Sequence, residues 1–384
     1  MHRPAGKTCF VMLFVSLAGL LPAQHGGSKV PKYTLPDPLT LLNGEKVTNA
    51  QTWTKKRRPE LIRLFETQVY GLAMAGRPKE MTWEVVAEDR HGIGGTAVTK
   101  TVKLYFAGTK DGPSMELVFT LPNNGKPVPA FLVAGNVRFN PRAVLDRGYG
   151  IIACRVDQIQ ADAPTGYEKS IRGYFAAPGQ TEPGSDEWGA ISAWAWGLSR
   201  AMDYIETDKD IEAGKVSLNG FGRYGKVAMW AGARDHRFAA TFSGESGCGG
   251  AGIARRGYGE TVAALIDKFG YWFDGEFKKY AGDVNSLPVD WHELIALYAP
   301  RPVYIATAAL DYWGDPTGAF LAAENADPVY KLFGETGLGV DAMPPVDTPV
   351  GDFIGYHNRS GEHIQNQYDW EQYLDFADRH FKKQ

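Results

Sequence analysis

The sequence predicts an α/β fold, a three-layer sandwich whose central sheet is mostly parallel and carries antiparallel strands at its N-terminal edge. Apolar and polar residues alternate between residues 81 and 121, with turn residues between the runs, which is typical of antiparallel strands. Farther along the chain, continuous apolar runs alternate with helical patterns. Such runs are typical of parallel strands that helices cover on both faces.

The N-terminus has the layout of a secretory signal peptide, which we place at residues 1–23. Arg3 and Lys7 precede an apolar run from residue 10 to residue 21, and Pro22-Ala23-Gln24 follows it. The apolar run is shorter than the roughly 20 residues that span a bilayer. We therefore expect no membrane span and a secreted or periplasmic protein.

Residues 24–48 are rich in proline and polar side chains, and we expect them to wrap the surface as a leader. Asn49 is then expected to cap a helix that ends near Tyr70. The rest of the chain has no internal repeat and no low-complexity linker. Residues 49–384 are therefore predicted to form a single domain.

Composition excludes several classes of partner. The formal charge is −3, with no block of five or more like charges, so nothing favours nucleic acid. Cys154 and Cys248, the two cysteines of the mature chain, are expected to be core residues, and their bonding stays open. No Cys/His pair has the spacing of metal ligands. We expect a monomer without metal or cofactor.

The elements of the parallel part follow one another regularly. A loop rich in glycine and proline, residues 158–186, is of the kind that lines a site. Strands are expected at residues 130–134, 150–154, 216–221, 238–243, 302–307 and 353–357, and helices at 188–205, from the turn after residue 221 to about 233, and at 369–381.

The stretch from Val216 to Lys226 is central to the function. A strand runs into the pattern G-x-G-x-x-G, formed by Gly220, Gly222 and Gly225, and a helix follows. In dinucleotide-binding folds such glycines approach a pyrophosphate, with an acidic residue about 20 positions on, where Glu245 stands here. In α/β-hydrolases the same turn is the nucleophile elbow, and Gly222 would normally be a serine.

Chain order favours the hydrolase. A dinucleotide fingerprint normally opens its domain, whereas here a long segment with mixed strands comes first. A hydrolase requires an acid after a later strand and a histidine after the last one. Glu245 and Asp311 each follow a predicted strand directly, and His363 lies in the loop after the last strand. An NAD-dependent oxidoreductase remains a remote alternative.

These residues resemble the glucuronoyl esterases of carbohydrate esterase family 15. Members carry G-x-S-R-x-G-K at the elbow, which stands here as residues 220–226. The resemblance covers most of the mature chain and implies an α/β-hydrolase fold. Further matching motifs lie, in the same order, at residues 230–233, 245–251, 255–262, 287–290, 299–304, 311–313 and 356–363.

The resemblance also implies the catalytic roles. His363 would be the general base, oriented by Glu245 or by Asp311, and Arg223 would stabilise the oxyanion. The chemistry agrees, because a histidine with a buried acid partner is held in one tautomer and can accept a proton.

Three further residues would bind the substrate. By the same resemblance, Lys226, Glu260 and Trp313 would hold the hydroxyls of a glucuronic acid unit. The family is understood to cleave the ester between 4-O-methylglucuronate on xylan and a lignin alcohol. The expected partner is therefore a glucuronate-bearing polysaccharide or its esters.

The chain departs from the family at the nucleophile. Gly222 has no side chain, so no acyl-enzyme can form there, and loss of a triad nucleophile leaves roughly 10³–10⁴-fold catalysis over water. Neither Ser217 nor Ser243 is placed to substitute, and the helix should turn Tyr224 away. Glycine readily adopts the backbone conformation of an elbow, so we expect the fold to stay intact.

Two hypotheses follow within the hydrolase fold. One is an impaired esterase in which His363 activates a water, and the other is a uronate-binding or xylan-binding pseudoenzyme. Retention of His363 and both candidate acids favours the esterase, whereas loss of the serine favours the binder. We expect the family's activity with very low turnover.

Overall fold

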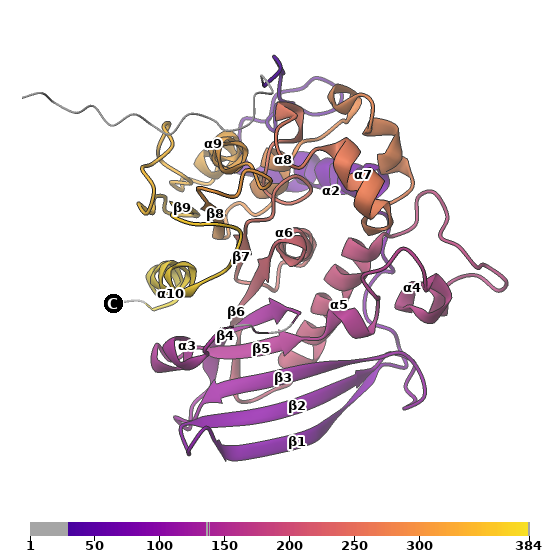
Figure 1. Cartoon of the computed structure of the whole chain (residues 1–384), viewed down its shortest axis with the longest axis vertical. Helices are drawn as coiled ribbons and strands as arrows, with labels where there is room; N and C mark the ends of the chain where they lie inside the picture. Colours follow the sequence, from indigo (N-terminus) through magenta and orange to yellow (C-terminus); the bar gives the residue numbers. More distant parts are fainter. Residues whose placement is uncertain (1–29, 136, 138, 383–384) are drawn as a thin grey trace, which may run out of the picture. The chain divides into compact units, whose positions relative to one another are not determined.

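The computed structural model describes residues 30–135, 137 and 139–382. The predicted signal peptide, residues 1–23, and the first residues of the leader lie outside the described part. The described residues from Pro31 onward group into one compact unit (Figure 1). Along the described chain, none of the helices has the length and apolarity needed to cross a membrane.

The described residues form one sheet of nine strands in the order β1-β2-β3-β5-β4-β6-β7-β8-β9. The first three strands and the β3–β5 pair are antiparallel, whereas every pair from β5 to β9 is parallel. The strands are β1 (Thr82–Gly92), β2 (Ala97–Tyr105), β3 (Ser114–Pro122), β4 (Val128–Ala134), β5 (Gly150–Cys154), β6 (Ile211–Phe221), β7 (Ala240–Gly244), β8 (Val303–Ala308) and β9 (Ile354–Arg359). The predicted mostly parallel sheet with an antiparallel N-terminal edge is confirmed.

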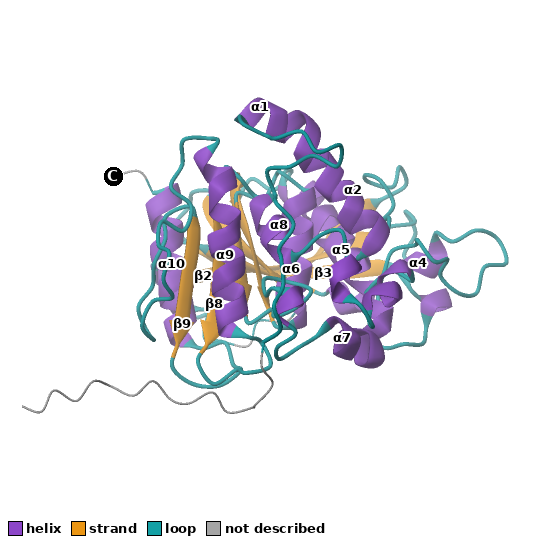
Figure 2. Ribbon diagram, turned by 90° about the horizontal axis from the view of Figure 1, so that it is seen from above, coloured by secondary structure: helices purple, strands orange, loops and turns teal. Residues whose placement is uncertain are grey.

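Helices cover both faces of the sheet. Adjacent residues of a strand point to opposite faces and therefore pack against different helices. Phe131 and Val133 pack in a smaller buried cluster with α3 and α10, whereas Leu132 and Ala134 belong to the larger core of α5, α6, α8 and α9. Figure 2 shows β8 and β9 between α10 and α9. The helices are α3 (Arg142–Asp146), α4 (Ile171–Tyr174), α5 (Ala190–Ile205), α6 (Arg223–Arg234), α7 (Val262–Phe269), α8 (Trp291–Ala296), α9 (Pro316–Lys331) and α10 (Gln367–Phe381).

The N-terminal helix begins where expected but is not continuous. The Asn49 side chain accepts a hydrogen bond from the backbone N–H of Thr52 and caps α1 (Ala50–Thr52). A π-helical turn at Trp53–Arg57 follows before α2 (Arg58–Gln68). Pro59 lies in the first turn of α2 and has no N–H to donate to the preceding turn, which accounts for the change of helix type there.

The described part of the leader is held against the domain. His292 Nε2 lies 2.8 Å from the carbonyl oxygen of Pro36, and Arg57 Nε donates to that of Pro38 at 3.2 Å. Leu41 and Val47 are buried in the main core. Cys154 and Cys248 are free and buried, which agrees with the prediction that both are core residues.

The strand order places the loops of interest together. The chain passes from β4 outward to β5 and then back to β6 on the other side of β4. In sheets of this kind ligands bind beyond the carboxyl ends of the parallel strands, near such a reversal. The loops that follow β6, β7, β8 and β9 all leave the sheet at that edge.

Candidate functional site

The turn between β6 and α6 has the geometry of a nucleophile elbow. Gly222 has φ 57° and ψ −123°, and its N–H donates to the carbonyl oxygen of Gly244 at 2.8 Å. A Cβ at Gly220 would lie 2.0 Å from the Tyr224 carbonyl oxygen, and one at Gly225 would lie 2.8 Å from the Ser246 Cβ. The outer glycines therefore serve close packing of strand and helix, and Gly222 occupies the strained position.

His363 faces that position from the loop after β9. An ideal Cβ built at residue 222 lies 3.4 Å from His363 Nε2 and 3.8 Å from its Cε1. Chain neighbours aside, no other described atom lies within 4 Å of that Cβ. A side chain at residue 222 would therefore start directly beside the nitrogen that a general base uses.

Two carboxylates meet the other ring nitrogen. His363 Nδ1 lies 2.8 Å from Asp311 Oδ2 and 3.0 Å from Glu245 Oε2, and both acids are buried. The hydrogen bond to Asp311 and the close contact with Glu245 raise the pKa of His363 to about 9. Burial raises the pKa of Glu245 despite its contact with His363. The sequence left open which acid pairs with His363, and the structure brings both to it.

The local backbone fixes each acid. Glu245 follows β7 with φ 47°, a left-handed conformation that is uncommon for a residue with a side chain, and its N–H donates to the Ala306 carbonyl oxygen at 2.8 Å. Asp311 follows β8, and its Oδ1 accepts the N–H of Gly314 at 3.0 Å. Both side chains therefore leave the carboxyl ends of neighbouring strands.

Arg223 is the first residue of α6 and directly follows Gly222. Its guanidinium forms an ion pair with Asp162 and lies 5.5 Å from the centre of the Trp272 ring. The Asp162 carboxylate also accepts hydrogen bonds from Tyr271 Oη at 2.7 Å and from Trp272 Nε1 at 2.8 Å. Asp162 comes from the predicted loop 158–186, and sequence reasoning did not single it out.

Lys226, Glu260 and Trp313 lie together, but only Trp313 is well exposed. Lys226 Nζ donates to Glu260 Oε2 at 2.5 Å and to the carbonyl oxygens of Ser246 and Cys248. The Glu260 backbone N–H donates to the Trp313 carbonyl oxygen at 2.8 Å. Trp313 is 42% exposed, with Lys268 Nζ 4.6 Å from its ring centre. The Lys226–Glu260 pair thus lies beneath the surface that Trp313 presents.

The serines near the elbow do not replace the nucleophile. Ser243 is buried, and its Oγ bonds to Ser246 Oγ at 2.8 Å. Ser217 is buried within β6, before the elbow. The Tyr224 ring packs toward Gly135, where an added Cβ would meet it at 3.0 Å. This agrees with the expectation that α6 turns Tyr224 away.

The described part of the chain contains one group of side chains that could bind a metal ion. Glu245, Asp311 and His363 each offer one ligand atom, and these atoms lie within 4.8 Å of one another. The same atoms already contact one another directly, with His363 Nδ1 2.8 Å from Asp311 Oδ2 and 3.0 Å from Glu245 Oε2. The expectation that no metal takes part stays a prediction, which activity in the presence of a chelator would test.

Sequence reasoning also missed the role of Arg359, the last residue of β9. This arginine is buried, and its Nη2 donates to Glu245 Oε1 at 2.5 Å. The sequence carries no local signal for this role, because polar residues in Ile-Gly-Tyr-His-Asn-Arg conceal the burial of the whole strand. Buried arginines are almost always paired, and here the partner is Glu245.

Known proteins match this chain over most of its length. The model of the family described as "Glucuronyl esterase, fungi" matches residues 108–334. Carbohydrate esterase MZ0003, from an unknown prokaryotic organism, is 40% identical, over 93% of this chain and 92% of that protein. The 4-O-methyl-glucuronoyl methylesterase of Hypocrea jecorina is 30% identical, over 78% of this chain and 62% of that protein.

Solved structures match as well. The glucuronoyl esterase from Solibacter usitatus is 43% identical and superposes with a TM-score of 0.87, over 92% of this chain and 99% of that one. A glucuronoyl esterase from Teredinibacter turnerae is 32% identical, with a TM-score of 0.82, over 90% and 89% of the two chains.

Proposed function

The chain belongs to the glucuronoyl esterase family, and we propose that it binds 4-O-methylglucuronate esters of xylan and hydrolyses them slowly, with water in place of the serine nucleophile. One observation carries the catalytic part. The Cβ position of residue 222 lies 3.4 Å from His363 Nε2, so His363 faces the place from which a nucleophile would attack.

The reaction needs no covalent enzyme intermediate. Neutral His363 accepts a proton at Nε2 from a water beside Gly222, and the water oxygen attacks the ester carbonyl carbon. Protonated His363, held by Asp311 and Glu245, then gives its proton to the departing alkoxide. The products are the uronic acid and the free alcohol.

In this proposal the positive charge of Arg223 stabilises the negatively charged oxygen of the tetrahedral intermediate. It is the residue after Gly222, and its side chain is 45% exposed at the site. A single oxyanion donor contributes about 2.7–4 kcal/mol in the transition state. In this proposal the guanidinium donates to the oxyanion from the place where Asp162 and Trp272 hold it.

Low turnover follows from two features. The water is not tethered as a serine hydroxyl would be, so it lacks the advantage of fixed proximity. The pKa of His363 is about 9, so most of the histidine is protonated at neutral pH and cannot accept a proton. Hydrolysis of a glucuronate methyl ester by the wild type beside His363→Ala tests this. Equal rates in the two proteins would contradict the mechanism.

A non-catalytic uronate or xylan binder is the second candidate, and the exposed Trp313 supports it, because an indole face suits a sugar ring. Calorimetry with 4-O-methylglucuronate tests binding directly. Trp313→Ala should weaken the affinity without unfolding the protein, because Trp313 is partly exposed. Measurable binding with no difference in hydrolysis between wild type and His363→Ala would favour the binder, and no heat would argue against both candidates.

The glycines do not support an oxidoreductase. Gly220 and Gly225 lie against the protein's own backbone and side chains at short distance, which leaves no room there for a pyrophosphate. We also propose that residues 1–23 direct export and that the mature protein is a secreted or periplasmic monomer. N-terminal sequencing of the exported protein tests the cleavage site. Light scattering tests the oligomeric state.

A further inference from the structure

Arg359 is the most heavily bonded buried side chain beside the site. Its Nε donates to Asp369 at 3.1 Å, and its Nη2 donates to Glu245 Oε1 at 2.5 Å. It is 1% exposed, so a guanidinium here would be very costly without partners. The two carboxylates supply the opposite charge that burial requires.

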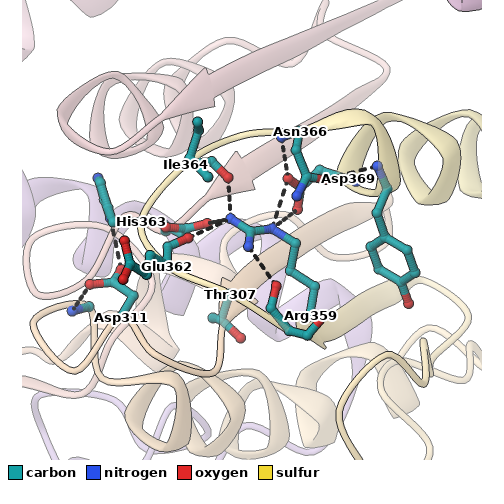
Figure 3. A network of polar contacts seen from close by, with 12 residues as sticks. Thr307, Asp311, Arg359, Glu362, His363, Ile364, Asn366 and Asp369 are labelled. Carbon is teal, nitrogen blue, oxygen red and sulfur yellow. Dashed lines mark hydrogen bonds and ion pairs between the residues drawn. The ribbon is translucent and has the colours of Figure 1, made fainter.

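The same guanidinium holds the loop that carries His363. Its Nη1 donates to the carbonyl oxygen of Ser360 at 2.9 Å, and its Nη2 donates to those of Glu362 at 2.9 Å and Ile364. Figure 3 shows Arg359 enclosed by this loop on one side, with Asp369 on the other. Two of these carbonyl groups directly flank His363, so the loop is fixed on both sides of the base.

Arg359 also connects the site to the core. Asp369, which it contacts, accepts the backbone N–H of Asn366 at 2.8 Å in the capping box that begins α10. Asp369 Oδ1 further contacts Nε2 of the buried His357 at 2.9 Å, and His357 Nδ1 lies 2.9 Å from Tyr304 Oη. The charged groups that face Arg359 are thus Glu245 and Asp369. Asp369 belongs to the first turn of α10, so Arg359 is anchored to that helix.

We propose that Arg359 is the positioning residue of this site: its ion pair with Glu245 directs that carboxylate at His363 Nδ1, and its bonds to the loop carbonyls fix the loop that aims Nε2 at residue 222. Without the guanidinium, Glu245 would be a buried carboxyl with one neutralising partner fewer. Such a group takes up a proton more readily, and the neutral carboxyl then attracts a protonated histidine less. The arginine acts through Glu245 and the loop and does not touch the substrate.

The crystal structure of Arg359→Met tests the geometric part without any need for turnover. Methionine fills similar space but donates no hydrogen bond. We expect His363 Nδ1 to leave hydrogen-bond distance of Glu245 and residues 360–364 to shift. A site that keeps the present 3.0 Å between Nδ1 and Oε2 would overturn the proposal.

A double-mutant cycle tests the energetic part. The cycle measures esterase activity and therefore rests on the proposed function, so the starting protein is Gly222→Ser. Arg359→Met, Glu245→Gln and the two together are each added to it. Misplacing a catalytic group by about 1 Å can cost on the order of 100-fold, so we expect kcat to fall by about 10- to 100-fold with KM little changed. If Arg359 acts through Glu245, its loss should cost much less when Glu245→Gln is already present.

Two further variants separate positioning from stability. Arg359→Lys keeps the charge and should recover part of the lost kcat. Arg301→Met is the matched control, since Arg301 also donates to buried carbonyl oxygens, those of Gly232 and Phe238, but away from the site. It should lower the unfolding temperature and leave kcat unchanged.

Fully additive losses in the cycle, or an equal loss of kcat in Arg301→Met, would overturn the proposal. An inactive Gly222→Ser protein would count against the proposed function alone, because the Arg359→Met structure still decides the role of the arginine.

Discussion

His363 Nε2 lies 3.4 Å from the ideal Cβ position of residue 222, although residue 222 is a glycine. The relationship joins two loops that follow different strands, β6 and β9. His363 and the carboxylates of Asp311 and Glu245 are thus assembled beside a position that carries no side chain. The predictions below follow from that arrangement.

A side chain at residue 222 should lower stability. The backbone there has φ 57° and ψ −123°, which glycine adopts freely but which costs other residues about 1–3 kcal/mol. Gly222→Ala and Gly222→Ser should both lose about this much free energy of unfolding, measured by urea denaturation. An unchanged or higher stability in both variants would contradict the strained geometry.

Small nucleophiles should accelerate the wild type. The space beside Gly222 borders His363 Nε2, so hydroxylamine can be deprotonated there and attack the ester, giving a hydroxamate and the free alcohol. The hydroxamate rate above the enzyme-free background should rise with hydroxylamine concentration. In Gly222→Ala the added methyl group occupies that space, and the acceleration should disappear. Equal acceleration in both proteins would contradict the assignment of this space to the nucleophile.

Activity should rise with pH toward about 9, because only neutral His363 can accept a proton and its pKa is about 9. Asp311 makes the larger contribution to this shift, so Asp311→Asn should lower the pKa of His363 more than Glu245→Gln does, as NMR titration of the ring would show. A pKa near the ordinary 6.5 in the wild type would contradict the paired geometry.

Stability should depend on pH in a defined direction. The pKa of His363 is higher in the folded protein, about 9, than in the unfolded chain, about 6.5. Protonated His363 therefore stabilises the fold fully below pH 6.5, and this contribution is lost as pH rises through about 9. The side chain is 46% exposed, so the effect should be small. The difference in unfolding free energy between wild type and His363→Gln should shrink over that range.

Breaking the Lys226–Glu260 pair should destabilise the protein. Both groups are buried, and removing one partner of such a pair typically costs about 3–5 kcal/mol. Lys226→Met should therefore lower the unfolding free energy strongly, and adding Glu260→Gln should cost less than its own single effect. Lys268→Met, at an exposed lysine above Trp313, is the control and should change stability by about 0.5 kcal/mol or less. A small effect of Lys226→Met would contradict a structural role for the pair.

Much of the fold could be predicted because hydrophobic patterns report burial. The alternating runs gave β1 to β3, and the continuous apolar runs gave the buried parallel strands. β6 begins at Ile211, five residues before the predicted strand. The sequence did not indicate this first half because the charged, half-buried Glu212 and Lys215 interrupt the apolar pattern. The π-helical turn before Pro59 was missed because local propensity does not distinguish helix types.

Site residues that follow the parallel strands in order could be predicted from the sequence. Residues whose role depends on contact with a distant segment could not. Asp311, Glu245 and His363 follow successive strands, so their order indicated the group. Arg359 and Asp162 have no local motif that reveals their partners. Arg359 pairs with Glu245, 114 positions away, and Asp162 pairs with Arg223. Folding alone brings the two members of each pair together.

The most direct test compares hydrolysis of a 4-O-methylglucuronate methyl ester by the wild type, Gly222→Ser and Gly222→Ala. A serine Oγ would extend from a Cβ that already lies beside His363 Nε2. We predict that Gly222→Ser raises kcat by about 10³-fold or more, since triad nucleophiles contribute factors of that order or larger, and that Gly222→Ala does not. Wild-type turnover equal to that of Gly222→Ser would contradict the claim that Gly222 limits this site.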